Sequence, residues 1–393
     1  MLKTYEAKLY PSKRQQKVIL TLLEDGRLFY NKILEIKIKT HKEQGKCLSL
    51  YDLQKMSKGK DMFPGLPASY KQVLIYRLII AFERFYNVHK HFPRYKNEKR
   101  FRIIHLRQYG IDYRFEGKEV KLWKFLGSIS MRGFRPLIGN PKEARIVKRA
   151  SGWYLQYVDE YDHQLPVKRD VRSAVGIDVG IKNFVFDSNG HRIDHPRYYI
   201  KSQRKLAALQ RSLSRKKKGS YRFRKLSLRV AKLHEHIANQ RKDFLHKLSH
   251  HYVKNYDAIF VEAFNISELL ENNPLVKHIS DASWGRFLNF LEYKSAESAV
   301  VFEKVSARYT SQRCSSCGGM VWKTLSQRTH ICPYYGYTAD RDENSAINVL
   351  KAGLEQAFGK GFQMESLMSR ESLPFRVGQF KHPNNSYLER VSG

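Results

Sequence analysis

Apolar residues recur at helical spacing in the first part of the chain. Between residues 11 and 45, side chains such as Val18, Leu22 and Phe29 fall on one face, while lysines and arginines fill the other. A second helical stretch, ASYKQVLIYRLIIAFERFYNVHKH, follows the turn-rich segment PGLP and ends before Pro93. The pattern therefore predicts helices with a basic side in this part of the chain.

The spacing then changes to that of β-strands. From about residue 100 to 170 the apolar positions alternate in short runs, which are KEVKLWKF, ARIVKRA and GWYLQYVDEY, bounded by glycine and proline. This segment is expected to form a small β-barrel or sheet module. The linker HQLPVKRD follows it.

After the linker the sequence predicts a mixed module of strands and helices. VRSAVGIDVG, IKNFVFDSNG and HRID are typical of three strands, and the second ends in a Ser-Asn-Gly turn. A long helical region follows over about 201–255, interrupted by the basic run SRKKKGSYRFRK. The strand DAIFVEAF, the helix SWGRFLNFLEYKSAESAV, the strand VVFEKVS, a cysteine insert and TADRDENSAINVL complete the module. Beyond about residue 355 there is little pattern, and a poorly ordered tail is expected.

The net charge of the chain indicates what the basic helix faces bind. Its 393 residues include 72 lysines and arginines against 37 acidic residues, a formal net charge of +35 spread over the whole length. Such a chain repels itself unless a polyanion neutralises it, so nucleic acid is the expected partner. No apolar run approaches the roughly 20 residues of a membrane span, and the start MLKTYEAKLYPSK lacks a signal peptide's apolar stretch. We expect an intracellular, soluble protein that makes no membrane contact.

Three acidic residues stand where their neighbours favour burial. Asp178 lies in the apolar strand GIDVG, Glu262 in the apolar strand IFVEAF, and Asp342 in DRDEN just before a helix. A buried carboxylate is normally paired, hydrogen-bonded or bound to metal. Three antiparallel strands, a parallel strand and a terminal helix can bring the three acids to one end of a sheet.

Together these acids could bind two divalent ions about 3.5–4 Å apart, which activate water and stabilise the leaving oxygen in phosphodiester hydrolysis. Carboxylate ligands suit Mg²⁺ or Mn²⁺. Each acid alone has another explanation, because Asp342 could cap a helix and Glu262 could pair with an arginine. The order of the three favours the metal site.

Three of the four cysteines cluster along the chain. Cys47 stands alone, whereas Cys314, Cys317 and Cys332 lie within one short segment. In a reducing compartment such a cluster favours a metal over disulfides. The run CSSC supplies one C-x-x-C pair with the spacing of a structural zinc site.

Four separated motifs resemble those of a known family. GIDVGIKNF, VEAFNIS, TSQRCSSCGG and ADRDENSAINVL occur in the order found in TnpB proteins, and HEHIANQRKDFLHKLS agrees as well. TnpB proteins are transposon-encoded RNA-guided DNA endonucleases of the OrfB type, related to the type V CRISPR effectors. The resemblance extends from YEAKLYPSKRQQ to about residue 352.

The resemblance implies an α/β multidomain fold. Its domains differ in secondary structure and role, and they are a β-barrel wedge domain (1–10 and 92–170), a helical recognition lobe (11–91), a RuvC-like nuclease with the RNase H fold (171–310 and 336–352), a zinc-ribbon-like insert that binds target nucleic acid (311–335) and a C-terminal tail (353–393).

The resemblance also implies roles for particular residues. Asp178, Glu262 and Asp342 match the family's catalytic acids, with Asp340 as structural support. Guide RNA would supply sequence specificity, while the protein reads the shape of the heteroduplex and a short motif beside the double-stranded DNA target. The active species would be a monomeric ribonucleoprotein in the cytoplasm of a bacterial or archaeal cell.

Basic residues in both halves of the chain are candidates for binding nucleic acid. The Arg94–Lys96 cluster could hold a phosphate and a base together, and the run near residue 216 would contact heteroduplex phosphates. The alternative for any single cluster is a solvated face. The candidates are Lys71, Arg77, Arg94, Lys96, Arg211, Arg215, Lys216, Lys217, Lys218, Arg222 and Arg224.

The cysteine insert departs from the family pattern at one position. Where the family has a fourth cysteine this chain has Tyr335, and a phenol is a poor zinc ligand because its reference pKa is about 10. His330 is the nearest substitute, since on a strand it shares a face with Cys332. Three alternatives stay open: zinc held by three cysteines and His330, a weakened or open site, and no metal.

Two other functions compete with RNA-guided cleavage of DNA. One is an RNA-guided DNA-binding repressor that has lost cleavage, but such a protein would be free to replace the three acids, and all are present. The other is a guide-independent nuclease of the resolvase type, which would not need so long a segment before the nuclease domain.

Overall fold

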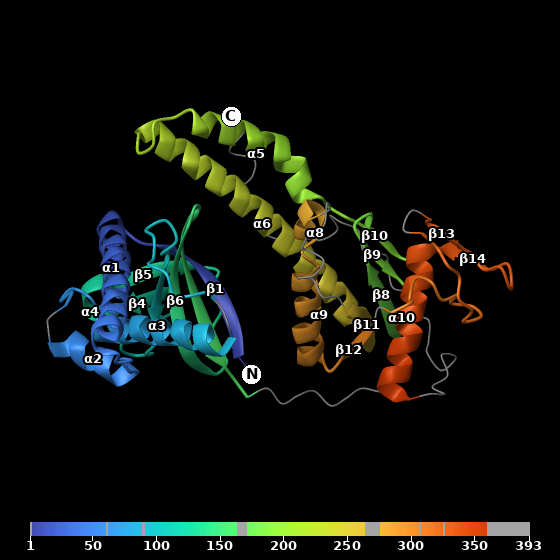
Figure 1. Cartoon of the computed structure of the whole chain (residues 1–393), viewed down its shortest axis with the longest axis horizontal. Coiled ribbons are helices and arrows are strands. Elements are labelled where there is room, and N and C mark those ends of the chain that lie inside the picture. The colour runs from blue at the N-terminus through green and yellow to red at the C-terminus, as the bar shows by residue number, and fades with distance from the viewer. Residues whose placement is uncertain are drawn as a thin grey trace. The chain divides into compact units, whose positions relative to one another are not determined.

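The computed structural model describes residues 2–59, 62–88, 91–162, 171–263, 276–306, 308–324 and 327–359. They belong to two compact units, Met1–His163 and Gln164–Gly393 (Figure 1). The predicted linker HQLPVKRD and most of the predicted C-terminal tail lie outside the described residues. None of the described helices has a stretch long and apolar enough to cross a membrane.

The first unit is built on an antiparallel sheet of seven strands in the order β2-β6-β7-β1-β5-β4-β3. Strand β1 at the N-terminus pairs with β5 and β7, which lie far along the sequence. The segments 1–10 and 92–170, expected to form one domain, therefore contribute to one sheet. The strands are β1 (Leu2–Tyr10), β2 (Ile103–Leu106), β3 (Tyr113–Glu116), β4 (Glu119–Leu122), β5 (Gly127–Arg132), β6 (Asn140–Arg149) and β7 (Gly152–Glu160).

Both helical stretches predicted in the first unit are confirmed, and the first of them forms the single helix α1. Helix α1 begins where Ser12 and Gln15 form a capping box, in which each side chain accepts a hydrogen bond from the other's backbone N–H. It ends at Gly45, whose φ of 63° suits glycine. The helices of this unit are α1 (Lys13–Gln44), α2 (Leu50–Gly59), α3 (Ala68–Val88) and the short α4 (Trp123–Leu126).

The second unit contains a five-stranded sheet in the order β10-β9-β8-β11-β12. Strands β10, β9 and β8 are antiparallel neighbours, and β11 runs parallel to both β8 and β12. The predicted sequence of three antiparallel strands followed by a parallel one is confirmed. The strands are β8 (Ala174–Val179), β9 (Asn183–Asp187), β10 (Arg192–Asp194), β11 (Ala258–Ala263) and β12 (Val301–Ser306).

Helices cover both faces of this sheet. Helices α6 and α9 pack on one face, and α10 packs on the other against β8, β11 and β12 (Figure 1). Helices α5 and α6 form a hairpin whose turn, residues 215–220, projects away from the sheet (Figure 1). The remaining elements of this unit are α5 (Tyr198–Ser214), α6 (Tyr221–Asn255), α8 (Val276–Ala282), α9 (Trp284–Ser298), α10 (Arg341–Phe358) and a small sheet of β13 (Thr329–Ile331) and β14 (Thr338–Asp340).

The end of α10 differs from the expected domain boundary. The nuclease domain was expected to end at residue 352, whereas α10 continues to Phe358. The helix therefore includes the first residues of the predicted tail, and residues 360–393 lie outside the described residues.

The alternation of side chains along β8 and β11 decides which residues face α10. Ile177 of β8 and Val261 of β11 belong to the core shared with α6 and α9. Phe260, one position earlier on β11, belongs to the core under α10. Because neighbouring side chains of a strand point to opposite faces, Asp178 and Glu262 both lie on the face that α10 covers.

Two glycines allow α10 to lie close to this face. At Gly176 of β8, an added Cβ would lie 2.2 Å from the carbonyl oxygen of Ala346 in α10. At Gly353 of α10, an added Cβ would lie 2.1 Å from the ring of Phe260. Both contacts are too short for any side chain, so glycine lets the helix and the strands approach each other directly.

We predict that Gly353→Ala lowers the stability of the second unit by roughly 1–3 kcal/mol, as overpacked cores do. The reason is that α10 must move away from Phe260 to make room for the methyl group. Thermal unfolding of the full chain measures the loss. Gly65→Ala is the matched control, because a Cβ there meets nothing within 4 Å. Equal melting temperatures for the two variants would contradict the close contact.

Candidate active site

Asp178 lies near the end of β8, on the face under α10, and is half-buried. Of the described residues, none donates a hydrogen bond to its carboxylate or forms an ion pair with it. Burial raises its pKa well above the usual range for aspartate, and the nearby carboxylates of Glu262 and Asp342 raise it further. The charge of Arg341 lowers this pKa in part. A bound cation would stabilise the ionised form of Asp178, since no described residue forms a hydrogen bond or ion pair with it.

Glu262 of β11 is 6% exposed. Its Oε1 atom accepts hydrogen bonds from the hydroxyl of Thr310 and, at 3.2 Å, from the hydroxyl of Ser345. Burial raises the pKa of Glu262, the two hydroxyl hydrogen bonds lower it in part, and Asp342 raises it. The alternative that Glu262 pairs with an arginine is wrong, because within the described part of the chain its partners are hydroxyls.

Asp342 reaches the site from the first turn of α10 and is 7% exposed. The N-cap of this helix is Asp340, whose side chain accepts a hydrogen bond from the Asp342 backbone N–H at 2.8 Å. The alternative that Asp342 is itself the cap is therefore wrong. Its Oδ1 atom lies 3.1 Å from Arg341 Nη2 and 3.7 Å from Arg328 Nη1.

The three acids fit a site for hard divalent cations. They offer only oxygen ligands, and one of them, Asp178, has no described partner. Their ligand atoms do not all lie within 4.8 Å of one another, a condition that only the cysteine cluster meets among the described residues. A two-ion site divides its carboxylates between the ions and does not need so tight a group. The donor chemistry therefore suits Mg²⁺ or Mn²⁺.

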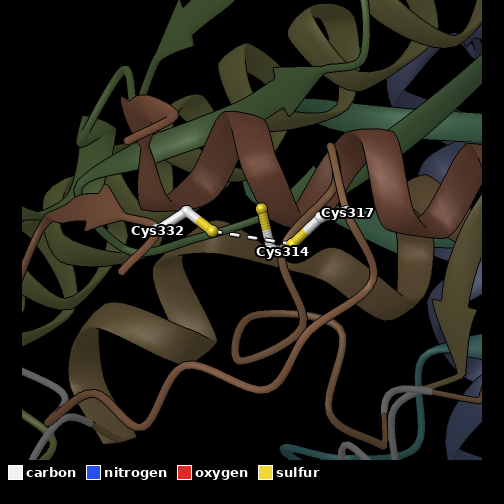
Figure 2. A group of neighbouring side chains, drawn as sticks. All are labelled: Cys314, Cys317 and Cys332. Atoms are coloured by element: carbon white, nitrogen blue, oxygen red, sulfur yellow. Dashed lines mark hydrogen bonds between the residues drawn. The ribbon is translucent and has the colours of Figure 1, made fainter. Parts of the chain in front are cut away.

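The sulfur atoms of Cys314, Cys317 and Cys332 point toward one another (Figure 2), and all lie within 4.8 Å. The Sγ atoms of Cys317 and Cys332 are 3.5 Å apart. Two backbone turns of the same form present them: the Gly318 N–H donates to the Cys314 carbonyl, and the Gly336 N–H donates to the Cys332 carbonyl, each at 2.9 Å. Three thiols between matching turns fit three of the four ligands of a tetrahedral zinc ion.

The backbone near Cys332 favours its thiolate form. Burial raises the pKa of this thiol, whereas hydrogen bonds from the backbone N–H groups of Tyr334 and Tyr335 lower it. Hydrogen bonds with the thiols of Cys317 and Cys314 lower it further, and the net direction is down. Zinc binds the thiolate, so this local geometry prepares Cys332 as a ligand.

The fourth ligand position is not completed by either candidate. Tyr335 is 77% exposed. His330 is buried, but its nitrogens do not join the group of sulfur atoms. Its Nδ1 instead forms a hydrogen bond with the Lys323 ammonium, and its Nε2 has no partner among the described residues. The structure therefore gives no support to His330 as the fourth ligand and favours the interpretation of an incomplete site.

The basic run of the second unit lies at the turn of the α5–α6 hairpin. Arg211 lies in the last turn of α5, Arg222 and Arg224 lie at the start of α6, and residues 215–218 lie between the helices. All of these basic residues are exposed except Lys216, which is half-buried. Within the described chain, no carboxylate forms an ion pair with them, so their charge is available to a polyanion.

The basic candidates in the first unit are less exposed. Arg94 is exposed, whereas Lys71 and Arg77, both on α3, are half-buried. Lys96 is half-buried as well, and its ammonium lies 5.0 Å from the centre of the Tyr30 ring, a cation–π contact. Arg94 is therefore the candidate with the most accessible charge in this unit.

Thr310 and Ser345, which hold Glu262 in place, were not among the predicted site residues. Ser345 had a signal, because it follows Asp342 by three positions and so lies on the same side of α10. Thr310 is 48 positions from Glu262 in the sequence, and no local pattern indicates that contact.

Three family models match the chain. They are described as "Probable transposase" of the OrfB_IS605 type over residues 156–273, "Cas12f1-like, TNB domain" over residues 284–349, and "Helix-turn-helix domain" of the OrfB_IS605 type over residues 1–46. In this structure the described part of the last region forms strand β1 and the single helix α1.

Individual proteins match over most of the chain. A Streptomyces pristinaespiralis protein named "Putative RNA-guided DNA endonuclease" is 30% identical over 383 residues, which cover 94% of both chains. The Escherichia coli (strain K12) protein "Putative RNA-guided DNA endonuclease InsQ" is 30% identical over 70% of this chain and 71% of its own length. A chain in "Cryo-EM structure of the Cas12f1-sgRNA-target DNA complex" is 16% identical to this chain, and the match covers 89% of this chain and 99% of that one, with a TM-score of 0.36.

These matches decide the class of the protein. The chain has an α/β multidomain fold and is a nuclease, the class to which the names of its relatives assign them. It belongs to the TnpB family, the OrfB-type proteins encoded by transposons.

We predict that Tyr335→Cys raises both the zinc content and the melting temperature of the protein. The substitution supplies a fourth thiol at the second turn, and metal that binds only the folded chain adds to its stability. Elemental analysis and thermal unfolding measure the two effects. Tyr334→Cys is the control, because it adds a thiol one position away. Equal zinc, near one per chain, in the wild type and in Tyr335→Cys would show that another ligand already closes the site, and His330→Ala would then test that ligand.

Proposed function

We propose that this chain is an RNA-guided DNA endonuclease. It binds a transposon-derived guide RNA, recognises a short motif beside the target, and cleaves DNA by two-metal-ion phosphodiester hydrolysis. The observation that carries the proposal is the meeting of Asp178, Glu262 and Asp342 under α10, with no described protein partner for Asp178. The names of the relatives support the RNA guide and the DNA target.

The chain's own residues prepare this site for cations. Bound ions would activate a water molecule and stabilise the leaving oxygen. Asp178 offers a carboxylate that no described residue occupies. Glu262 is held through Oε1, so its Oε2 atom has no donor among the described residues. Asp342 is fixed at its backbone by Asp340, and the arginine ion pairs of its Oδ1 must loosen if that atom is to bind an ion.

The remaining parts of the chain would serve the two nucleic acids. Residues 171–310 and the segment from 336 through α10 would form a RuvC-like nuclease with the RNase H fold. Residues 311–335 would form a zinc-ribbon-like insert that binds the target nucleic acid. The helices and the sheet of the first unit would act as recognition lobe and wedge. The exposed turn of the α5–α6 hairpin would contact phosphates. The protein would work as a monomeric ribonucleoprotein in the cytoplasm.

We predict that Asp178→Asn abolishes cleavage while binding of guide RNA and target DNA stays within a few fold, because the basic surfaces are unchanged. The same variant should raise the melting temperature of the metal-free protein at pH 7, since it removes a charge that burial and two acids disfavour. This gain should grow as pH rises from about 4, where an unfolded aspartate ionises but the folded Asp178, with its raised pKa, keeps its proton.

The controls for this experiment separate the proposed function from its alternatives. Asp194→Asn changes an exposed aspartate of the same sheet and should leave cleavage unchanged. Glu262→Gln and Asp342→Asn should abolish cleavage without adding to the effect of Asp178→Asn, because the acids act as one site. Cleavage that survives in Asp178→Asn would refute the assignment. A wild type that binds guided targets but does not cut them would instead indicate a repressor.

We predict that affinity for the guide RNA falls roughly a thousandfold or more between about 50 and 200 mM salt if six or more phosphate contacts form. Replacing Lys216, Lys217 and Lys218 together by glutamine should reduce the slope of log affinity against log salt by about one for each lost contact, without changing which sequence is bound. Binding titrations at several salt concentrations measure the slope. The triple Lys→Arg variant keeps the charge and should keep the slope. A flat salt dependence in the wild type would contradict the polyanion surface.

A further inference from the structure

The segment that leads into the cysteine cluster is bound to one face of α10. The side-chain amide of Asn348 donates hydrogen bonds to two of its carbonyls, that of Thr310 at 2.8 Å and that of Arg313 at 2.7 Å. Asn348 is only 8% exposed. A single buried amide therefore fixes both ends of the residues 310–313.

Two more side chains on the same face extend this contact. Asn344, one helical turn before Asn348, donates to the Arg313 carbonyl at 2.8 Å and accepts from the Ser315 N–H at 2.8 Å. Lys351, one turn after Asn348, donates to the Ser315 carbonyl. Asn344 is fully buried. Without α10 the backbone groups of Thr310, Arg313 and Ser315 would lose these hydrogen bonds, so the contact favours one position of the segment.

The side chain of Thr310 connects this segment to the acidic site. Its hydroxyl donates to Glu262 Oε1, and both residues are less than a tenth exposed. Ser345, on α10 itself, donates to the same oxygen atom. Two hydroxyl donors on one oxygen of a carboxylate determine how the group is turned, and they leave Oε2 as its unoccupied atom among the described contacts.

We infer that Thr310 is a positioning residue for Glu262, and that the Asn348 amide sets the position of Thr310. The β-branched side chain of threonine supports this role, because its χ1 angle is restricted once the backbone is fixed. When a side chain that hydrogen-bonds to a metal ligand and orients it is removed, metal affinity or activity typically falls by roughly 10- to 100-fold. The inference rests on the proposed function, since the orientation of Glu262 matters only if Glu262 binds a cation.

The test uses Mn²⁺ as the probe and Thr310→Val as the variant, which removes the hydroxyl and keeps the branched shape. Thermal unfolding of the full chain over a series of Mn²⁺ concentrations gives the concentration needed for half of the metal-induced rise in melting temperature. We expect Thr310→Val to raise this concentration roughly tenfold or more. Thr310→Ser should restore it, because serine returns the hydroxyl. The Mn²⁺ concentration for half-maximal cleavage should shift in parallel, with guide RNA affinity unchanged.

Thr4→Val is the matched control, since Thr4 is an exposed residue of β1 in the first unit and the substitution removes a hydroxyl outside the unit that contains Glu262. It should leave the Mn²⁺ requirement at the wild-type value. An unchanged requirement in Thr310→Val, or a Thr310→Ser variant as impaired as Thr310→Val, would overturn the inference.

A double-mutant cycle tests the part assigned to Asn348. Asn348→Ala should raise the Mn²⁺ requirement in the wild-type background, and it should have much less effect in the Thr310→Val background, because both changes act on Glu262 through one contact. Fully additive effects would show that Asn348 acts independently of Thr310 and would overturn that part.

The outcomes distinguish this inference from the proposed function. A wild type that shows no Mn²⁺-dependent stabilisation and no cleavage would refute the proposed function. A wild type that is stabilised by Mn²⁺ and cleaves DNA, together with a Thr310→Val variant that behaves identically, would refute only the role of Thr310.

Discussion

The direct contact of α10 with β8 and β11 is the constraint on which the second unit depends. Gly176 and Gly353 remove the side chains that would hold the helix away from the strands. The helix can therefore bring Asp342 in its first turn to a sheet face that already carries Asp178 and Glu262. With a larger residue at either glycine, the helix and its acid would move away from the strands together, because α10 packs along them as one element.

The same helix supports two different sites along its length. Its first turn supplies Asp342, and its next turns supply the amides that hold the segment 310–315. That segment contains Cys314, so the thiol cluster is attached to the helix that completes the acidic site. The turn around Cys332 has the same backbone hydrogen bond as the turn around Cys314, although Tyr335 stands at the position that Cys317 takes in the first turn. Only backbone groups make that bond.

Basic and acidic residues gather on different surfaces of the molecule, and the two surfaces attract ions of opposite charge. The chain as a whole carries a formal charge of +35, and its exposed hairpin turn has lysines and arginines with no described acidic partner. The face under α10 instead gathers acids, and burial, together with their mutual repulsion, raises the pKa values of Asp178 and Glu262. A polyanion is attracted by the first surface, while small cations are attracted by the second, so one chain can hold both.

The sequence by itself determined that Asp178 and Glu262 stand in two apolar strands, because continuous runs of valine, isoleucine and phenylalanine are typical of buried strands. The face on which the two acids lie follows only from the packing of α10 on the sheet. The sequence also indicated the thiol cluster and the basic run. Only the tertiary structure decided that Asp340 caps α10, that Thr310 donates to Glu262, and that His330 stays apart from the cysteines. These contacts depend on how distant segments pack, and local periodicity carries no information about the packing partner of a single polar side chain.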